Sequence, residues 1–203
     1  MKTLFIPAIS KQKLNKKNLS QIAKLPKDIA LCYSIQYKEI AKEVKEILSK
    51  KHNILSFSQV LGCSQLKLSK KTKAILLITD GKFHAIGLAY ESKLPVYIFN
   101  NFKLQQISKQ DISKFEKNQK ARYLRYLHAD KIGILVSTKH GQQNLKKALQ
   151  FKETCKKQAN IFLSNNIDTA EFENFPEIQF WVNTACRRMD LNSNSIINID
   201  QIK

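Results

Sequence analysis

The stretch Asp28-Ile-Ala-Leu-Cys-Tyr-Ser34, together with the residues after it, decides the fold. Its apolar run predicts a buried strand. Residues 37–50 follow, with Ile40, Val44 and Leu48 at helical spacing and Lys and Glu on the opposite side. A buried strand followed by an amphipathic helix is the unit from which parallel sheets are built, so this stretch predicts an α/β protein.

The same pattern begins again in the second half of the chain. Lys131-Ile-Gly-Ile-Leu-Val-Ser137 predicts another buried strand, and residues 143–157 predict the helix after it. We infer two related α/β halves of about 100 residues each. The expected fold is α/β, with two similar domains at 28–104 and 105–203 that each hold a small parallel sheet flanked by helices.

Further elements are expected around these units. Strands are predicted at 74–79, 95–99, 160–163 and 178–182, a long helix at 111–127, and a helix start at 168–171. Residues 57–63 resemble a turn, and residues 100–109 form a polar connection. The N-terminal residues 1–27 fit less well, with a strand-like piece at 3–7, a Lys-rich lead-in and a marginal helix at 19–25.

Composition excludes several classes of protein. The 203 residues carry a formal net charge of +19, and 43% hydrophobic residues with 5 Gly and 4 Pro exclude a disordered or collagen-like chain. The apolar runs are far shorter than the ~20 residues that a membrane span needs, and Lys11 interrupts any secretory leader. We therefore expect a cytoplasmic protein without a membrane partner.

The basic charge is weak support for nucleic-acid binding. Arg122, Arg125, Arg187 and Arg188 are the only Arg residues among the 35 basic ones, and Arg is the residue that reads bases and grips phosphates bidentately. The Lys clusters in residues 11–17 and 67–73 lack aromatic residues for base stacking. A nucleic-acid partner is therefore disfavoured, although a weaker electrostatic attraction to an acidic or RNA-loaded partner remains open.

The four cysteines have different sequence contexts. Cys32 lies inside the first strand and Cys155 late in a predicted helix, so we interpret them as a small buried hydrophobe and an incidental thiol. Cys63 and Cys186 each follow an apolar segment and begin a loop, where parallel sheets carry ligands. The sequence has no CxxC pair, which disfavours a zinc ribbon or a thioredoxin-like site. Cys63 and Cys186 could therefore be ligands of an iron–sulfur cluster, ligands of a composite metal site, or structural thiols.

Other predicted strand ends are polar, as a ligand crevice requires. Ser34 and Gln36 lie at the end of the strand that begins at Asp28, residues 80–84 follow the strand at 74–79, and residues 137–142 end the strand that begins at Lys131. Their hydroxyls, amides and small turns suit a nucleoside and an amino-acid group. Ordinary helix capping is the alternative reading.

Five segments together resemble one family. They are Ser34-Ile-Gln36, Gln59-Val-Leu-Gly-Cys63, Asp80-Gly-Lys-Phe-His-Ala-Ile-Gly87, Ser137-Thr-Lys-His-Gly-Gln142 and Trp181-Val-Asn-Thr-Ala-Cys-Arg-Arg188. In order and approximate spacing, over residues from about 28 to 203, they resemble the diphthamide synthase family. The resemblance implies a transferase of the first step of diphthamide biosynthesis.

The family's known chemistry sets the expected cofactors and partner. Three similar domains each offer one Cys to a 4Fe–4S cluster, S-adenosylmethionine is cleaved reductively, and a 3-amino-3-carboxypropyl radical adds to a His of translation elongation factor 2. The resemblance makes Cys63 and Cys186 the metal ligands of this chain. It implies as cofactor-binding residues Ser34, Gln36, Asp80, Gly81, Lys82, Phe83, His84, Ser137, Thr138, Lys139, Gly141, Gln142 and Arg188.

The sequence departs from the family pattern in two places. The first domain and its Cys have no counterpart, so residues 1–27 would be a remnant of that domain, and the third thiolate would come from another chain in a homo- or hetero-oligomer. The usual Ala-Cys-Pro-Arg reads Ala185-Cys186-Arg187-Arg188, and Asn192 and Ser193 replace expected acidic residues. The alternative function is a non-catalytic accessory subunit or docking module of an intact synthase.

Overall fold

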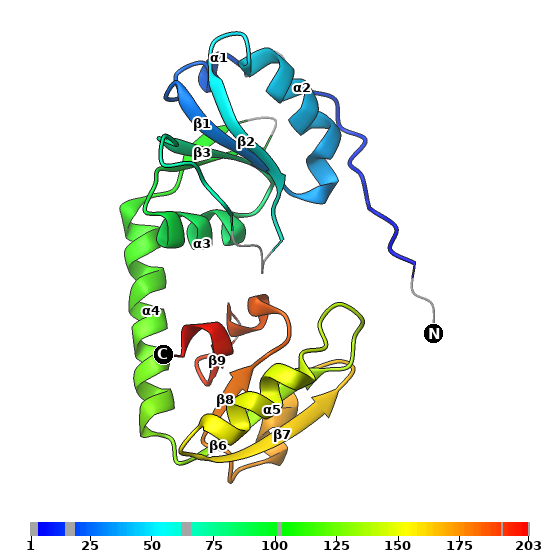
Figure 1. Cartoon of the computed structure of the whole chain (residues 1–203), viewed down its shortest axis with the longest axis vertical. Helices are drawn as coiled ribbons and strands as arrows, with labels where there is room; N and C mark the ends of the chain where they lie inside the picture. The colour runs from blue at the N-terminus through cyan, green and yellow to red at the C-terminus, as the bar shows by residue number, and fades with distance from the viewer. Residues whose placement is uncertain (1–3, 15–18, 62–65, 101–102, 192, 203) are drawn as a thin grey trace. The chain divides into compact units, whose positions relative to one another are not determined.

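A computed structural model describes residues 4–14, 19–61, 66–100, 103–191 and 193–202 (Figure 1). The chain divides into two compact units, Met1–Phe115 and Glu116–Lys203. The division lies within helix α4 (Lys109–His128), not between residues 104 and 105 as the sequence pattern indicated. The difference arises because strand β5 (Leu104–Gln106) pairs with β4 (Val96–Phe99) and completes the first sheet.

The first unit has one five-stranded sheet. Its strands β1 (Asp28–Tyr33), β2 (Asn53–Gln59) and β3 (Ala74–Ile78) join β4 and β5 in the order β2-β1-β3-β4-β5. All neighbouring pairs are parallel except β4 and β5, which are antiparallel. The carboxyl ends of β1, β2, β3 and β4 therefore lie at one edge of the sheet.

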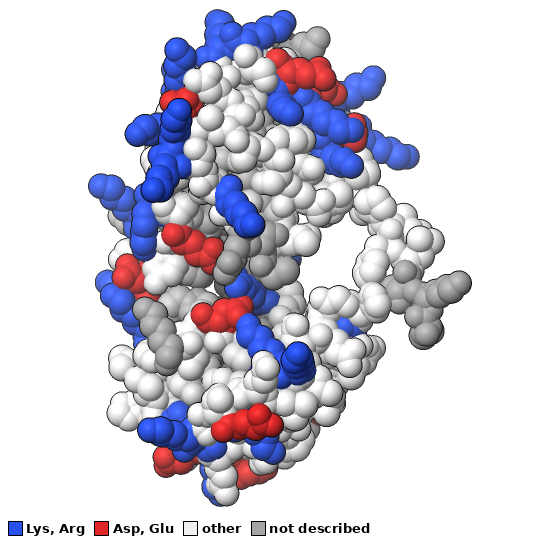
Figure 2. Space-filling view, viewed as in Figure 1, with Lys and Arg blue, Asp and Glu red and all other residues white. Residues whose placement is uncertain are grey.

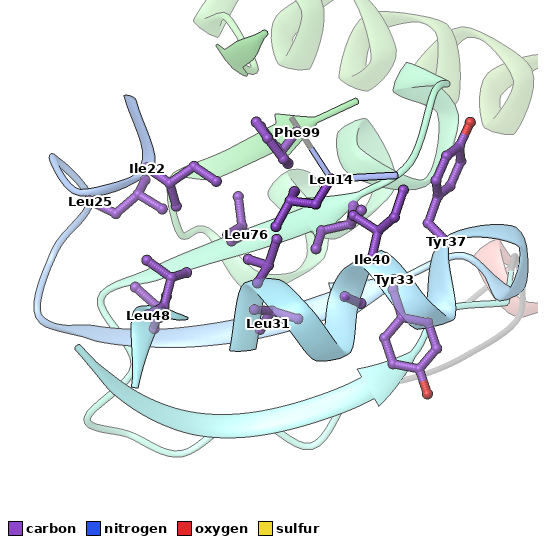
Figure 3. Close-up of a cluster of buried hydrophobic side chains, with 14 of the residues drawn as sticks. Leu14, Ile22, Leu25, Leu31, Tyr33, Tyr37, Ile40, Leu48, Leu76 and Phe99 are labelled. Carbon is purple, nitrogen blue, oxygen red and sulfur yellow. The ribbon is translucent and has the colours of Figure 1, made fainter. Parts of the chain in front are cut away.

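Helices cover both faces of this sheet. Helix α2 (Lys38–Leu48) packs its buried face against Leu31 and Leu76, and Figure 3 shows Ile40 and Leu48 of the helix in one cluster with those strand residues. Helix α3 (Lys82–Ser92) packs against the opposite face. Strand residues alternate between the two faces because successive side chains of a strand point in opposite directions.

The second unit holds a fully parallel sheet in the order β7-β6-β8-β9. Its strands are β6 (Lys131–Ser137), β7 (Gln158–Ser164), β8 (Phe180–Asn183) and β9 (Ile196–Asn198). Residues of α4 and α5 (Leu145–Thr154) pack on one face. The other face is covered by aromatic residues of the 3-10 helix η3 (Thr169–Asn174) and the loop after it, which contact Trp181.

Two similar α/β units with small, mostly parallel sheets confirm the predicted fold class. Several local predictions were wrong or incomplete. The turn-like segment 57–63 begins inside β2, whose residues are mostly half-buried, and the polar connection 100–109 contains β5. Strand β9 and helix α3 were missed.

The N-terminal segment forms no sheet in its described part. Residues 4–14 contain neither helix nor strand, and Leu4, Phe5 and Ile6 have 82%, 68% and 81% of their surface exposed. An apolar run forms a strand only where a neighbouring strand accepts its backbone hydrogen bonds. The segment is followed by the short helix α1 (Leu19–Ile22), whose Ile22 is buried in the core of the first unit. Among the described helices, none combines the length and the apolar composition that crossing a bilayer requires.

Candidate functional site

The carboxyl edge of the first sheet brings together three of the predicted segments. Ser34 follows β1, and its backbone N–H donates to Ile78 O at 3.0 Å, beside the end of β3. Val60 follows β2 and donates to Tyr33 O at 2.8 Å. These bonds hold the ends of three neighbouring strands together, so the segments after them share one edge. Cys63 itself lies outside the described residues.

Two polar groups at this edge have the properties of a binding site. The Ser34 side chain is buried, and its Oγ has no hydrogen-bond partner among the described residues. A buried hydroxyl without a partner is costly unless a ligand or water supplies one. Asp80 accepts a hydrogen bond from the hydroxyl of Tyr37, whose ring lies at one end of the hydrophobic cluster in Figure 3.

Tyr37 was not among the predicted site residues. Burial, and then the hydrogen bond to the Asp80 carboxylate, raise the pKa of the Tyr37 phenol to about 12. The phenol therefore stays protonated at neutral pH, and its O–H group donates the hydrogen bond that holds the Asp80 carboxylate in place. Its only signal in the sequence is its position at the start of the helix after the first strand.

Lys82, Phe83 and His84 lie in a helix and not in a loop, contrary to the sequence prediction. They form the first turn of α3, with Gly81 as its N-cap residue. The Phe83 and His84 rings contact each other with centroids 5.0 Å apart, and Lys82 Nζ lies 3.5 Å from Asp111 Oδ2. The run Asp80-Gly-Lys-Phe-His84 is equally compatible with a helix start, because Gly is among the residues accepted at the N-cap position.

Gln36 lies in the 3-10 helix η2 (Ile35–Tyr37), directly after Ser34. Its backbone carbonyl accepts a hydrogen bond from Ser10 N at 2.8 Å. Leu14 packs into the same hydrophobic cluster as Tyr37. The described N-terminal segment is therefore attached beside the carboxyl edge of the first sheet.

The second unit builds a corresponding edge from the segment after β6. Ser137 is buried, and its Oγ donates to Asn165 O at 3.3 Å and accepts from Lys139 N at 3.1 Å. The turn closes when Gln142 N donates to Lys139 O at 3.0 Å. Gly141 has φ +79°, a left-handed conformation that glycine adopts without strain. Thr138, Lys139 and Gly141 are exposed around this turn, and Gln142 is half-buried.

Cys186 lies beside this turn, in the loop after β8. Its thiol is free and half-buried. The Asn183 amide organises the loop, donating to Cys186 O at 2.8 Å and to Asn198 Oδ1 at 2.6 Å, and accepting from Ala185 N at 2.9 Å. Asn144, just after the turn, donates to Thr184 O at 2.7 Å. The segments after β6 and β8 are therefore joined by direct hydrogen bonds.

The two arginines after Cys186 differ in their surroundings. Arg187 donates from Nε and Nη2 to Asp200 Oδ2 at 3.0 and 2.8 Å. Lys147 also donates to Asp200, and although burial opposes it, these bonds lower the pKa of the Asp200 carboxyl. Arg187, which replaces the expected Pro, thus has a structural role. Arg188 is exposed.

The free cysteines in the described residues are not equivalent as metal ligands. Burial raises the pKa of the Cys32 thiol to about 11, despite a contact with the Ser58 hydroxyl. Because the thiolate is the metal-binding form, Cys32 is a poor ligand. Cys155 caps α5 and contacts the carbonyls of Lys152 and Lys157. In the described part of the chain, no three His, Cys, Asp or Glu residues form a group that could hold a metal ion.

The donor set therefore fits an iron–sulfur cluster only in part. Cys186 has the accessibility and the loop position of a thiolate ligand, and Cys63, the other predicted ligand, lies outside the described residues. The sequence motifs did not mark Tyr37, Asn144, Asn183 and Asn198 as site residues. Asn183 stands three residues before Cys186, inside the motif already recognised, but its role as the organiser of the loop depends on β9 placing Asn198 beside it.

Comparison with known proteins identifies the family of this chain. The family model described as "Putative diphthamide synthesis protein" matches residues 1–195. The chain belongs to the diphthamide synthesis family. Its membership confirms the resemblance carried by the five motifs.

Curated members of the diphthamide synthesis family cover most of this chain. The 2-(3-amino-3-carboxypropyl)histidine synthase of Pyrococcus horikoshii is 29% identical over 206 residues, which are 94% of this chain and 60% of the relative. The synthase of Methanocaldococcus jannaschii is 30% identical over 155 residues, 70% of this chain and 42% of the relative. Subunit 1 of the Mus musculus synthase is 23% identical over 177 residues. The chain spans 60% or less of the length of each of these relatives.

Two solved structures share the fold. The crystal structure of Dph2 from Pyrococcus horikoshii matches with a TM-score of 0.80 and 26% identity, over 92% of this chain and 59% of that one. A second structure of the same protein contains a 4Fe–4S cluster and matches equally well.

Proposed function

We propose that this chain is a component of a 2-(3-amino-3-carboxypropyl)histidine synthase, which carries out the first step of diphthamide biosynthesis. The reaction transfers a 3-amino-3-carboxypropyl group from S-adenosylmethionine to a His of translation elongation factor 2. Family membership and the names of the curated relatives support this reaction class.

The observation that carries the proposal is the loop of Cys186. A half-buried free thiol stands at the carboxyl end of a parallel sheet, and a buried amide network fixes its backbone. Such preorganisation is typical of a ligand loop, because a ligand must be held by groups that do not themselves bind the metal. Cys186 and Cys63 would hold the 4Fe–4S cluster, which supplies the electron for reductive cleavage of S-adenosylmethionine.

The polar strand ends would bind the cofactor's polar groups. The unpartnered Ser34 hydroxyl is available as donor or acceptor, and Asp80 is held by Tyr37 as an acceptor for an amino or hydroxyl group. In the second unit the exposed Thr138 and Lys139 of the 137–142 turn offer a hydroxyl and an ammonium group, and the half-buried Gln142 offers an amide.

A third thiolate would come from outside these 203 residues. Cys32 is buried with a raised pKa, and Cys155 belongs to a helix end away from the predicted ligand loops. We propose that a domain not contained in these 203 residues, such as one on a partner chain, contributes the third thiolate.

Anaerobic reconstitution with iron and sulfide tests this proposal. We expect a broad visible absorbance that is strongest with a partner chain present and that Cys186→Ser or Cys63→Ser weakens, whereas the matched control Cys155→Ser leaves it unchanged. A reconstituted mixture should then modify elongation factor 2 in the presence of S-adenosylmethionine and a reductant. Absence of a cluster under every pairing would refute the catalytic role, and wild-type diphthamide levels in cells carrying Cys63→Ser/Cys186→Ser would assign the chain to the accessory alternative.

A further inference from the structure

The loops that precede the strands of the first unit are strongly basic. These loops are residues 23–27, 49–52, 69–73 and 93–95, which come before β1, β2, β3 and β4. They contain no Asp or Glu. Their eight lysines are Lys24, Lys27, Lys50, Lys51, Lys70, Lys71, Lys73 and Lys93. Because β1 to β4 are parallel, all four loops lie at the amino edge of the sheet, opposite the edge that holds the candidate site.

Backbone hydrogen bonds join these loops to one another. Asn53 N donates to Lys27 O at 2.7 Å, and Lys73 N donates to Asp28 O at 2.9 Å. All eight lysines are exposed, and Figure 2 shows Lys and Arg side chains crowding the end of the first unit where β2 begins in Figure 1. Lysines that are up to about 70 residues apart in the sequence therefore form one surface, which we call the lysine edge.

Little negative charge opposes the lysine edge. Asp28 begins β1 and accepts a hydrogen bond from Asn53 Nδ2 at 2.8 Å, while Glu46 and Glu91 lie near the ends of α2 and α3. Among the described residues, none of the eight lysines forms an ion pair, in contrast to Lys42, which binds Glu39 at 3.0 Å. The lysine edge thus keeps its positive charge available to an external partner.

The second unit supplies an internal comparison. The segments before its strands, residues 129–130, 155–157, 175–179 and 193–195, contain two Lys and also Asp130 and Glu177. One of these lysines, Lys157, donates to Leu127 O and Ala129 O at 2.9 and 2.6 Å and so caps α4. A general abundance of Lys would affect both units equally. The concentration of charge is therefore a property of the first unit.

We propose that the lysine edge binds the phosphate backbone of nucleic acid without reading its sequence. Ammonium groups attract phosphates as point charges, and the loops contain neither Arg nor aromatic residues that would recognise bases. A protein partner fits less well, because protein interfaces are depleted in Lys and depend on aromatic or apolar anchors. The large exposed apolar side chains of the described residues all lie outside these loops.

Fluorescence anisotropy of the full chain with a labelled RNA duplex tests the lysine edge. The logarithm of the affinity should fall linearly with the logarithm of the salt concentration. The variant K50Q/K51Q/K70Q/K71Q should lose about tenfold or more in affinity and have a shallower salt slope, since each lost phosphate contact removes about 0.9 from the slope. The control K131Q/K146Q/K152Q/K156Q removes the same charge from exposed lysines of the second unit and should change affinity only slightly.

Several results would overturn the proposal. They are absence of binding at low salt, equal losses in the two quadruple variants, and competition by polyglutamate as effective as that by RNA. A DNA duplex in parallel identifies which backbone is preferred, and binding of either one supports phosphate recognition. Thermal melts check folding, and K50Q/K51Q and K70Q/K71Q as separate variants replace the quadruple variant if it unfolds. Binding needs no cluster, so this test is independent of the proposed synthase function.

Discussion

The hydroxyl of Tyr37 donates a hydrogen bond to the carboxylate of Asp80 and so ties the segment after β1 to the segment after β3. The two residues come from neighbouring strand ends, where the candidate cofactor site of the first unit lies. Tyr37 is 5% exposed, whereas Asp80 is exposed. The core thus supplies a fixed hydrogen-bond donor to an exposed carboxylate.

Replacing Tyr37 by Phe should lower the free energy of unfolding by about 1 kcal/mol, the usual contribution of one hydrogen bond. The ring stays in the core, so packing is preserved. Urea denaturation of the two proteins measures the difference. Asp80→Asn is the companion variant, and an unchanged stability in both variants would show that the hydrogen bond contributes nothing.

The same pair predicts a dependence on alkaline pH. Burial and the Asp80 hydrogen bond raise the pKa of Tyr37 from 10.0 to about 12 in the folded state. A group whose pKa is raised by folding stabilises the protein fully below its unfolded pKa and loses that contribution as the pH rises through its folded pKa. The stability of the wild type relative to Tyr37→Phe should therefore decline between pH 10 and about 12. A difference that stays constant across this window would contradict the assignment.

Asn183→Ala should release the loop of Cys186. Asn183 is buried, and its removal takes away the hydrogen bonds that its amide makes with Asn198 Oδ1, the Cys186 carbonyl and the Ala185 N–H. We expect a loss of about 3 kcal/mol, because unsatisfied buried groups each cost about 1–3 kcal/mol. Maleimide should also modify Cys186 faster in this variant. Wild-type stability together with a wild-type modification rate would reject the role of Asn183.

Gly133→Ala tests the close contact of β6 with β8. A Cβ at Gly133 would lie 2.3 Å from Cζ3 of Trp181, inside the aromatic cluster. We expect a loss of about 3 kcal/mol, at the upper end for overpacking. Gly87→Ala is the matched control, since a Cβ there meets nothing within 4 Å and α3 should gain about 0.5–1 kcal/mol. Thermal melts that rank the two variants in the opposite order would contradict the packing described.

Thiol modification distinguishes the cysteines. Cys32 is fully buried with a pKa of about 11, so its thiolate fraction at neutral pH is about 100-fold below that of an ordinary thiol. Peptide mass spectrometry after brief treatment with maleimide should find Cys155 and Cys186 modified and Cys32 modified only in urea. Native modification of Cys32 at the rate of Cys186 would refute its burial.

The buried strands were predictable because their apolar runs have a single stable placement. The sequences at 28–34, 74–79 and 131–137 lie within a residue of β1, β3 and β6. Strand β2 was not predictable by the same reasoning, because Ser56 and Ser58 interrupt its apolar residues. A strand at the edge of a sheet is half-buried and depends on its neighbour more than on its own hydrophobicity.

In the candidate site, too, some residues were predictable from local sequence and others depended on tertiary packing. The motifs marked Cys186, Ser137 and Asp80 because each combines an apolar strand with a polar end. The roles of Tyr37 and Asn183 were invisible, since each acts on a residue that only the packing of neighbouring strands brings near.

Hydrophobic periodicity and local motifs are properties of short segments, so they sufficed to predict the two α/β units, their main strands, the family and the residues at the strand ends. The tertiary structure alone decided which groups meet: the Tyr37 hydroxyl with Asp80, the Asn183 amide with Asn198, and lysines from four separate loops at one edge of a sheet. Parallel pairing causes all three, because it brings segments that are far apart in the sequence to the same end of neighbouring strands.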